Sequence, residues 1–214
     1  MAGTAYPAVL LLGPTGAGKT PLGQWIELHG WAGQRCLHFD FGENLRKAVR
    51  NELPSDCVSS QDIQFLRGVL EHGVLLEDQD FPIAERMLLG FLTQRHADHR
   101  TRIILNGLPR HTGQADAMQH LVAVQTVVCL DCDARTVLLR IQHDPAGDRV
   151  GRIDDLLPAV RKKLSIYDQR TTPLVDWYRQ RGASILRIPV SAQMTAAQMW
   201  QEVQPAACLH PDDS

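Results

Sequence analysis

The chain has 214 residues, of which 44% are hydrophobic and 21% charged, and this balance is typical of one globular domain with a real core. Its net charge of −2 predicts no broad basic face, which argues against nucleic acid as a partner. No apolar run is long enough to cross a membrane, and five cysteines without a regular framework favour reduced thiols, so we expect a cytoplasmic protein.

Short apolar runs alternate with longer helical stretches along the chain. Continuous apolar runs that end at glycine or polar residues are typical of strands buried on both faces of a parallel sheet. The predicted strands are Ala8–Leu12, Cys36–Phe39, Arg102–Leu105, Thr126–Leu130 and Ser184–Ile188. The predicted helices are Thr20–His29, Glu43–Asn51, Ser60–His72, Ile83–Arg95, Gln114–His120, Arg135–Gln142, Leu156–Arg181 and Thr195–Val203. The alternation predicts a doubly wound α/β sheet with right-handed crossovers.

Three features interrupt this simple alternation. Residues 41–75 and the Gly/Pro/Asp-rich loop His143–Arg152 fall outside it, and we expect both to be inserts over one edge of the sheet. Ligands of such folds bind at that edge, beyond the carboxyl ends of the strands. Pro173 lies inside the longest predicted helix, where it predicts a kink or a break.

The strongest motif follows the first predicted strand. It reads Gly13, Pro14, Thr15, Gly16, Ala17, Gly18, Lys19 and Thr20, which matches the P-loop pattern G-x-x-x-x-G-K-[ST]. The glycines let backbone N–H groups turn inward around phosphate oxygens, and the next helix adds the positive end of its dipole. Lys19 then reaches the β- and γ-phosphates, and the Thr20 hydroxyl can bind Mg²⁺. The sequence therefore predicts a nucleoside triphosphate site, with Lys19 facing solvent while the loop is empty.

Later motifs narrow the class of protein, since a P-loop alone does not separate kinases, ATPases and GTPases. No Asn/Thr-Lys-x-Asp motif follows Thr126, which argues against a GTPase. The segment Ile104–Arg110 ends a buried strand with a turn that presents an arginine. Further along the chain come Arg152-Ile153-Asp154-Asp155, Val160-Arg161-Lys162-Lys163-Leu164, Tyr167 and Thr172-Pro173-Leu174.

With these motifs in this order, the sequence resembles the adenylate kinase family of nucleoside monophosphate kinases, from the P-loop to about Gly182. The resemblance implies a P-loop NTPase fold with a five-stranded parallel sheet in the order 2-3-1-4-5. It also implies a single domain over residues 1–214, with a helical insert for the nucleoside monophosphate (NMP) at 41–75 and a short lid at 143–152. The implied reaction is reversible transfer of the γ-phosphoryl group of MgATP to an NMP, with AMP as the expected acceptor.

The resemblance also assigns roles to individual residues. The segment His38–Arg46 resembles the family's H-x-S-T-G-D-x-L-R motif, so Arg46 corresponds to an arginine that grips the acceptor phosphate. Arg110 is implied as a second phosphate contact, and Gln114 as the reader of the adenine edge of AMP. The implied catalytic residues are Lys19, Arg110, Arg149, Arg152 and Lys163. The implied NMP-binding residues are Phe41, Gly42, Arg46, Gly107, Arg110 and Gln114, and those near Mg²⁺ are Thr20, Asn106 and Asp40.

Several residues depart from the family pattern. Asn106 stands where the family has an aspartate that helps to hold the Mg²⁺ shell, and Asp40 adds a carboxylate that the pattern lacks. Phe41 replaces a small residue on the adenine side, and Lys163 replaces an arginine. After the P-loop lysine this chain has Thr20-Pro21 where the family has Gly-Thr.

These departures leave three functions open. One is the NMP kinase, expected as a monomer that uses ATP and a monophosphate. Another is a P-loop kinase for a non-nucleotide hydroxyl or acid, in which Asp40 grips the substrate or activates its hydroxyl. The third is a nucleotide sensor or slow ATPase, in which Asn106 weakens catalysis and a partner reads the closing motion.

Overall fold

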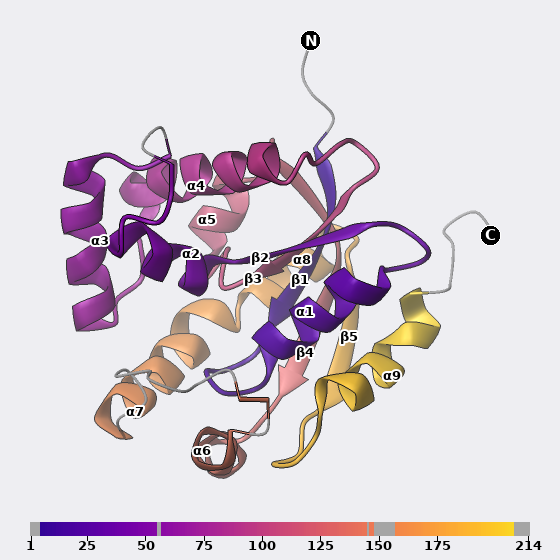
Figure 1. Ribbon diagram of the computed structural model, residues 1–214. Helices are drawn as coiled ribbons and strands as arrows, with labels where there is room; N and C mark the ends of the chain where they lie inside the picture. The colour runs from indigo at the N-terminus through magenta and orange to yellow at the C-terminus, as the bar shows by residue number, and fades with distance from the viewer. Residues whose placement is uncertain (1–4, 55–56, 145, 148–156, 208–214) are drawn as a thin grey trace.

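The computed structural model describes residues 5–54, 57–144, 146–147 and 157–207, and within them five parallel strands form one sheet with helices on both faces (Figure 1). The strands are β1 (Tyr6–Leu12), β2 (Cys36–Asp40), β3 (Arg102–Asn106), β4 (Val122–Asp131) and β5 (Ser184–Pro189). The helices are α1 (Lys19–His29), α2 (Phe41–Val49), α3 (Ser60–His72), α4 (Phe81–Gln94), α5 (Thr112–Ala117), α6 (Ala134–His143), α7 (Leu157–Ile166), α8 (Leu174–Arg179) and α9 (Ala196–Ala207). Two short turns complete the list, a 3₁₀ turn η1 (Asp78–Asp80) and a π turn η3 (Tyr167–Thr171).

The strand order is β2-β3-β1-β4-β5, which confirms the predicted order. The central strand β1 pairs with β3 and β4, and β3 also pairs with β2. Leu11 of β1 lies beside Asn106 of β3, and Asn106 lies beside Asp40 of β2. Because all strands are parallel, this register brings the carboxyl ends of β1, β2 and β3 to one edge, where the P-loop begins.

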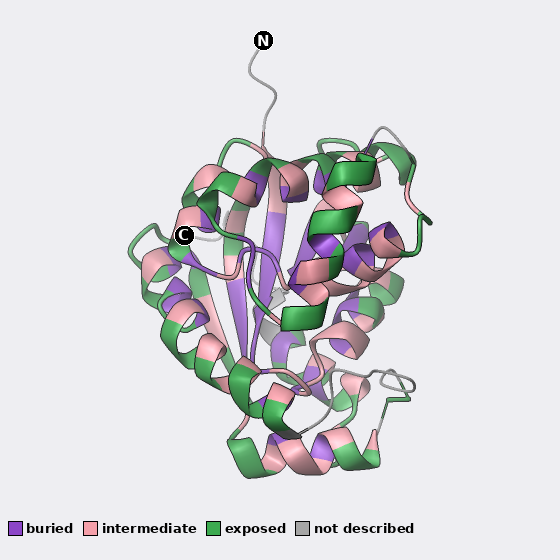
Figure 2. Cartoon of the chain, turned by 90° about the vertical axis from the view of Figure 1, so that its left-hand side faces the viewer, coloured by how far each residue is buried: buried purple, intermediate pink, exposed green. Residues whose placement is uncertain are grey.

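The two faces of the sheet belong to two separate cores. Ala8 and Leu10 of β1 pack in the core that also contains side chains from α2, α3, α4, α5 and α8. Val9 and Leu11 pack in the core on the other face, beneath α1 and α9. Figure 2 shows the strands buried between the helical layers. Burial on both faces explains why the strand sequences are continuously apolar rather than alternating. Within the described ranges, no helix is long and apolar enough to span a bilayer.

Helix α2 begins at Phe41 instead of the predicted Glu43, because Asp40 caps it. The Asp40 Oδ1 accepts a hydrogen bond from the backbone N–H of Glu43 at 2.9 Å. Residues 41–75, predicted as an insert, contain α2 and α3, which pack against each other at the edge of the molecule seen on the left of Figure 1. The last residue of β2 is therefore also the residue that starts the insert.

The long helix predicted over Leu156–Arg181 is interrupted before Pro173, as the proline predicts. Pro173 has no N–H, so the ordinary helical bond to the carbonyl four residues earlier is absent at this position. The N–H of Thr172 instead donates to the carbonyl of Tyr167, five residues earlier, at 2.9 Å. The wider π turn η3 therefore separates α7 from α8.

Other bounds also differ from the sequence-based ones, and β4 and α5 are two examples. Strand β4 begins at Val122, ahead of the predicted Thr126, because its first residues pair with the start of β1 across a bulge between Ala8 and Val9. Helix α5 covers Thr112–Ala117, starting and ending earlier than the predicted Gln114–His120. The ring of its N-cap residue, His111, accepts from a backbone N–H of the first turn, which fixes the early start.

Two helical glycines give a test of this packing. A Cβ built on Gly23 of α1 would lie 2.3 Å from Nε2 of the buried His38, whereas one on Gly68 of α3 would meet nothing within 4 Å. Gly68→Ala should raise the free energy of unfolding by roughly 0.5–1 kcal/mol, the usual gain for a helical alanine. Gly23→Ala should instead lower it by about 1–3 kcal/mol, because overpacking outweighs that gain. Urea denaturation measures both, and a stabilised Gly23→Ala protein would contradict the packing of His38.

Candidate active site

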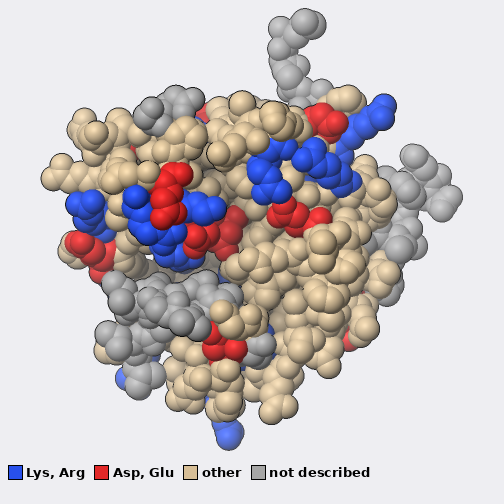
Figure 3. Space-filling view, in the orientation of Figure 1, with Lys and Arg blue, Asp and Glu red and all other residues tan. Residues whose placement is uncertain are grey.

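A cavity opens at the edge of the sheet where β1, β2 and β3 end. Its walls come from the P-loop, the start of α2, the end of α3, the turn after β3, and the helical segment α7–η3. On the face shown in Figure 3, basic side chains gather over α2 but are interleaved with acidic ones. Of the residues predicted for the site, the lining includes Gly13, Thr15, Gly16, Gly18, Lys19, Thr20, Asp40, Phe41, Gly42, Arg46, Asn106, Gly107, Arg110 and Lys163. The topology thus brings most of the predicted residues to one place.

The P-loop connects β1 to α1 in the way the motif predicts. Gly16 and Gly18 have φ angles of +80° and +101°, a region that side chains other than glycine rarely adopt. Gly18 is also the N-cap of α1, so the loop runs straight into the positive end of the helix dipole. This arrangement of backbone N–H groups and helix terminus suits the binding of phosphate oxygens.

Lys19 is half-buried instead of extending into solvent as the sequence-based expectation had it. Its ammonium group folds back over the loop and donates hydrogen bonds to the carbonyl oxygens of Gly13 and Pro14, at 2.7 and 2.8 Å. A half-buried ammonium group is stable here because the loop supplies these acceptors. The lysine side chain therefore reinforces the loop geometry, and an incoming phosphate would compete for its N–H groups.

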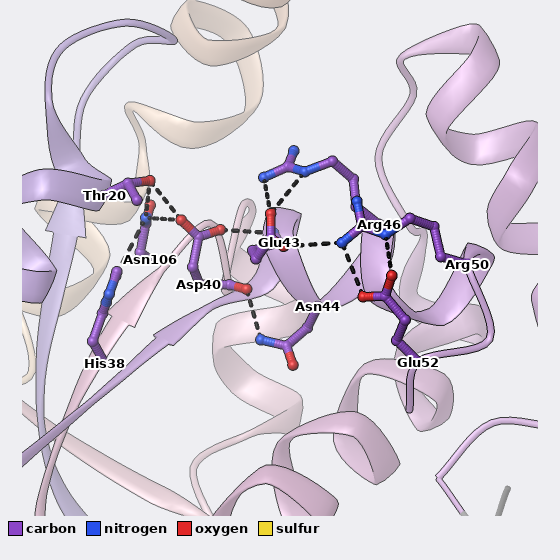
Figure 4. Close-up of polar contacts among 9 residues, drawn as sticks. All are labelled: Thr20, His38, Asp40, Glu43, Asn44, Arg46, Arg50, Glu52 and Asn106. Carbon is purple, nitrogen blue, oxygen red and sulfur yellow. Dashed lines mark hydrogen bonds and ion pairs between the residues drawn. The ribbon is translucent and has the colours of Figure 1, made fainter. Parts of the chain in front are cut away.

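Three side chains meet where β2, β3 and α1 converge (Figure 4). The Thr20 hydroxyl donates to Asp40 Oδ2 at 2.5 Å, and Asn106 Nδ2 donates to the same oxygen at 2.8 Å and to Thr20 Oγ1 at 3.1 Å. The Asp40 carboxylate is thus shared, with Oδ2 toward the P-loop and Oδ1 on the N-terminus of α2. A carboxylate with this many donors is held in one orientation.

His38 lies behind this group. It is buried, and its Nε2 lies 3.5 Å from Asn106 Nδ2. Burial lowers the pKa of the His38 imidazole, while the nearby Asp40 carboxylate partly opposes that shift. A neutral ring can accept a hydrogen bond from the Asn106 amide, which helps to point that amide at Asp40.

The oxygens of this group fit a magnesium ion. Mg²⁺ prefers hard oxygen ligands and is usually held by one or two carboxylates together with substrate phosphates and water. Thr20 supplies a hydroxyl and Asp40 a carboxylate, and both line the cavity beside the P-loop. Asn106, which the resemblance places near Mg²⁺, turns its NH₂ group toward Thr20 and Asp40. It orients the carboxylate.

Two arginines line the cavity away from the P-loop, with different environments. Arg46 of α2 forms an ion pair with Glu43, one helical turn earlier, at 2.9 Å. Arg110, after β3, has no hydrogen bond or ion pair from its guanidinium to any residue that the structure describes, and burial lowers its pKa to about 10. Even so, Arg110 stays charged at neutral pH. Arg110 is half-buried, and removing part of a cation from water without a counter-charge is unfavourable, so Arg110 is better prepared than Arg46 to bind an anion.

Gln114 does not reach the cavity wall, contrary to the role implied for it. The side chain is buried, with its Oε1 accepting from the backbone N–H of Arg110 at 2.8 Å and its Nε2 donating to the carbonyl of Leu76 at 2.9 Å. These two bonds hold the amide between the turn after β3 and the loop after α3. In this structure Gln114 supports the backbone of Arg110 and does not line the acceptor side.

Arg140 of α6 is a site residue that the sequence reasoning missed. It is buried, lines the cavity, and donates from Nε to the carbonyl of Gly16 at 3.1 Å and from Nη1 to the carbonyls of Ser191 and Met194 at 2.7 and 2.9 Å. These bonds tie the P-loop to the loop after β5. Its sequence signal was an arginine flanked by apolar residues in the run 137–141.

Arg149 and Arg152, predicted for the lid, lie outside the described residues, as do Asp154 and Asp155. Lys163, which follows the predicted lid along the chain, is among the described residues and lines the cavity.

A second cavity adjoins the first beside α1 and shares Pro21, Arg140 and Ala146 with it. Its remaining lining is largely apolar and includes Trp25, Leu28 and Met194. The Trp25 indole N–H is buried and has no hydrogen-bond partner among the described residues. A flat apolar group with a hydrogen-bond acceptor would satisfy both features.

Known proteins resemble this chain in sequence and in fold. An adenylate kinase of Stenotrophomonas maltophilia (strain R551-3) is 33% identical over 182 residues, covering 81% of this chain and 86% of that protein. An adenylate kinase of Synechococcus sp. (strain WH7803) is 30% identical over 191 residues, covering 86% and 90%. The solved structure of a gluconokinase from Sinorhizobium meliloti 1021 has a similar fold, with a TM-score of 0.52 at 14% identity over 95% of this chain and 93% of that one. No protein-family profile matches the chain.

The P-loop lysine gives the first test of the site. Lys19→Met should weaken ATP binding or turnover about tenfold to a hundredfold, because it removes a charge-assisted contact of roughly 1.5–3 kcal/mol to phosphate. Calorimetric titration with ATP and a coupled turnover assay measure the two effects. Lys162→Met is the matched control, since Lys162 donates to the carbonyl of His72 on α3 and should leave ATP binding unchanged. Normal ATP affinity and turnover in Lys19→Met would refute the P-loop assignment.

Proposed function

The chain belongs to the adenylate kinase family of phosphotransferases, and we propose that it transfers the γ-phosphoryl group of MgATP to AMP. Its relatives support the broader class of nucleoside monophosphate kinase, and AMP as acceptor is the specific proposal. We further propose that the enzyme acts as a monomer in the cytoplasm, with residues 41–75 as the acceptor insert and 143–152 as the lid.

One observation carries this proposal: a single cavity is lined by a phosphate-binding loop and by a half-buried arginine that has no counter-charge among the described residues. The P-loop and Lys19 would hold the donor phosphates, and Arg110 and Arg46 would hold the acceptor phosphate across the cavity. Phosphoryl transfer depends on in-line positioning and on positive charge around the transferring oxygens. Arginine suits this task because its planar fork can bind two phosphate oxygens.

Magnesium would be held by Asp40 and Thr20, together with the donor phosphates. When bound, it would supply positive charge that stabilises the negative charge on the phosphates during transfer. Asn106 would keep the Asp40 carboxylate oriented through its 2.8 Å hydrogen bond. This chain would therefore carry its metal-side carboxylate on β2, where the family pattern carries it after β3.

The remaining basic residues would act around the transferred group. Lys163 lines the cavity. Arg140 would hold the P-loop and the loop after β5 together through its hydrogen bonds to both. Arg149 and Arg152 would close over the phosphates from the lid, and exclusion of water by that closure would favour transfer over hydrolysis.

The two bases would occupy different apolar surfaces. The acceptor base would pack against a wall that includes Phe41, Leu45, Val69 and Val74, all of which line the first cavity. The donor base would occupy the second cavity, where the Trp25 N–H lacks a partner. Gln114 can contribute to base selection only indirectly in this arrangement, through the backbone of Arg110.

Two other functions are distinguished by one substrate panel. Transfer to a non-nucleotide hydroxyl would use Asp40 to grip the substrate or to activate its hydroxyl, but both of its oxygens already accept hydrogen bonds from the protein. A sensor or slow ATPase would hydrolyse ATP without an acceptor. Coupled assays with AMP, other monophosphates, hydroxy acids and no acceptor separate these cases. ATP consumption that AMP does not stimulate would refute the proposal.

The carboxylate on β2 can be tested by exchanging two side chains. Asp40→Asn should raise the Mg²⁺ concentration for half-maximal turnover about tenfold or more, because it removes the charge beside Thr20. Asn106→Asp should not rescue the metal site by itself, because it replaces a 2.8 Å hydrogen bond by two adjacent carboxylates. It should also lower the free energy of unfolding without Mg²⁺ by about 1–3 kcal/mol.

The double exchange Asp40→Asn with Asn106→Asp is the matched control, because it keeps one carboxylate and one amide. It should recover part of the Mg²⁺ response. Magnesium titrations of turnover and of thermal unfolding provide the measurements. An unchanged Mg²⁺ response in Asp40→Asn would mean that Thr20 and the nucleotide phosphates hold the metal without Asp40.

The acceptor arginines make a separate prediction. Arg46→Met and Arg110→Met should each lower kcat/KM for AMP about tenfold to a hundredfold, with ATP affinity nearly unchanged, because one charge-assisted phosphate contact is lost. Arg110→Met should cost more, since Arg46 already shares its charge with Glu43. Arg50→Met is the control, because Arg50 pairs with Glu43 and Glu52 on the outside of the insert. An equal loss of ATP binding would assign these arginines to the donor phosphates instead.

A further inference from the structure

The backbone of Arg110 is held at both of its polar groups by buried side chains. Its N–H donates to Gln114 Oε1 at 2.8 Å, and its carbonyl accepts from the Thr171 hydroxyl at 2.8 Å. Gln114 is 1% exposed and Thr171 4% exposed, so neither hydrogen bond competes freely with water. The guanidinium of the same residue, by contrast, has no partner among the described residues.

The two clamping residues come from distant parts of the chain. Gln114 is on α5, and its own amide is fixed by a hydrogen bond to the carbonyl of Leu76 at 2.9 Å. Thr171 is the last residue of the π turn η3, some sixty residues further along the chain, and it also lines the cavity. Arg110 is therefore anchored to two elements that come from distant parts of the chain.

The π turn explains how Thr171 comes to this position. Pro173 cannot donate a backbone hydrogen bond, and the wider turn that results ends at Thr171. An ion pair between Arg170 and Glu77, at 2.9 Å, joins the same turn to the loop before α4. The helix irregularity thus places a hydroxyl against the turn after β3. π turns are frequent at functional sites for this kind of reason.

We propose that Thr171 is a positioning residue, which acts with Gln114 to hold the backbone of Arg110 so that the guanidinium stays in the cavity and meets the acceptor phosphate. Thr171 acts through Arg110 and does not itself touch the phosphate. The proposal rests on the proposed function only for the identity of the acceptor. Because a misplaced arginine weakens phosphate binding and also slows transfer, loss of the Thr171 hydroxyl affects the acceptor and spares the donor.

Thr171→Val removes the hydroxyl and keeps the shape of the side chain, whereas Thr171→Ser keeps the hydroxyl. Thr171→Val should raise the dissociation constant for AMP about threefold to thirtyfold, as expected for one lost hydrogen bond to a buried carbonyl, and should lower kcat as well. ATP affinity should stay within about twofold in the same variant. Thr171→Ser should behave like the unaltered protein. Calorimetric titration with AMP and with ATP measures both constants.

A control variant and a double-mutant cycle distinguish a positioning role of Thr171 from a merely structural one. The hydroxyl of the neighbouring Thr172 donates its hydrogen bond to the carbonyl of Tyr167 in the same π turn and not to Arg110, so Thr172→Val should leave AMP affinity unchanged. In an Arg110→Met background, Thr171→Val should have no further effect on AMP binding, because its route runs through Arg110.

The results that would overturn the proposal are specific. They are an unchanged AMP constant in Thr171→Val, an equal loss for ATP and AMP, or a full Thr171→Val effect that persists without Arg110. If the unaltered protein neither binds nor phosphorylates AMP, the proposed function fails by itself. The same cycle with inorganic phosphate as the probe then decides the role of Thr171, since the guanidinium takes a phosphate whatever is attached to it.

Discussion

The hydrogen bonds of one carboxylate, that of Asp40, join the parts on which this site depends. Oδ2 binds the Thr20 hydroxyl at the end of the P-loop and the Asn106 amide at the end of β3, and Oδ1 caps α2. A single side chain therefore couples the phosphate loop, the neighbouring strand and the acceptor insert. Because each oxygen has its own donors, the charge is fixed in place before any ligand arrives, which is the condition for effective electrostatic catalysis.

This clustering follows from the order of the sheet. In a parallel sheet the strand ends lie together, and the register sets Asp40, Asn106 and Leu11 side by side. The two cores on either face of β1 make the sheet rigid, so the site rests on strands while the lid and the insert are attached at its rim. The donor side and the acceptor side of the site are therefore held by different elements. The P-loop is held by α1 and Arg140, whereas the backbone of Arg110 is held by α5 and η3.

The departures from the family pattern become coherent in three dimensions. The amide of Asn106 donates to Asp40, so the loss of a carboxylate after β3 and the gain of one on β2 are parts of one arrangement. Phe41, which stands where the pattern has a small residue on the acceptor side, packs in the main core and lines the cavity as well. These changes keep one carboxylate beside Thr20 and alter the strand from which it would face the metal.

The sequence by itself determined the strands, the P-loop, the break before Pro173 and, through the resemblance, the strand order. These depend on local patterns: apolar runs, glycine at positive φ, and a proline without an N–H. Only the tertiary structure decided that Lys19 folds onto Gly13 and Pro14, that Gln114 supports Arg110, and that Arg140 bridges two loops. Each of these is a choice of hydrogen-bond partner between segments distant in the chain or across a folded loop. No local sequence pattern encodes this choice of partner, because the choice depends on which buried polar groups the packing brings within hydrogen-bonding distance.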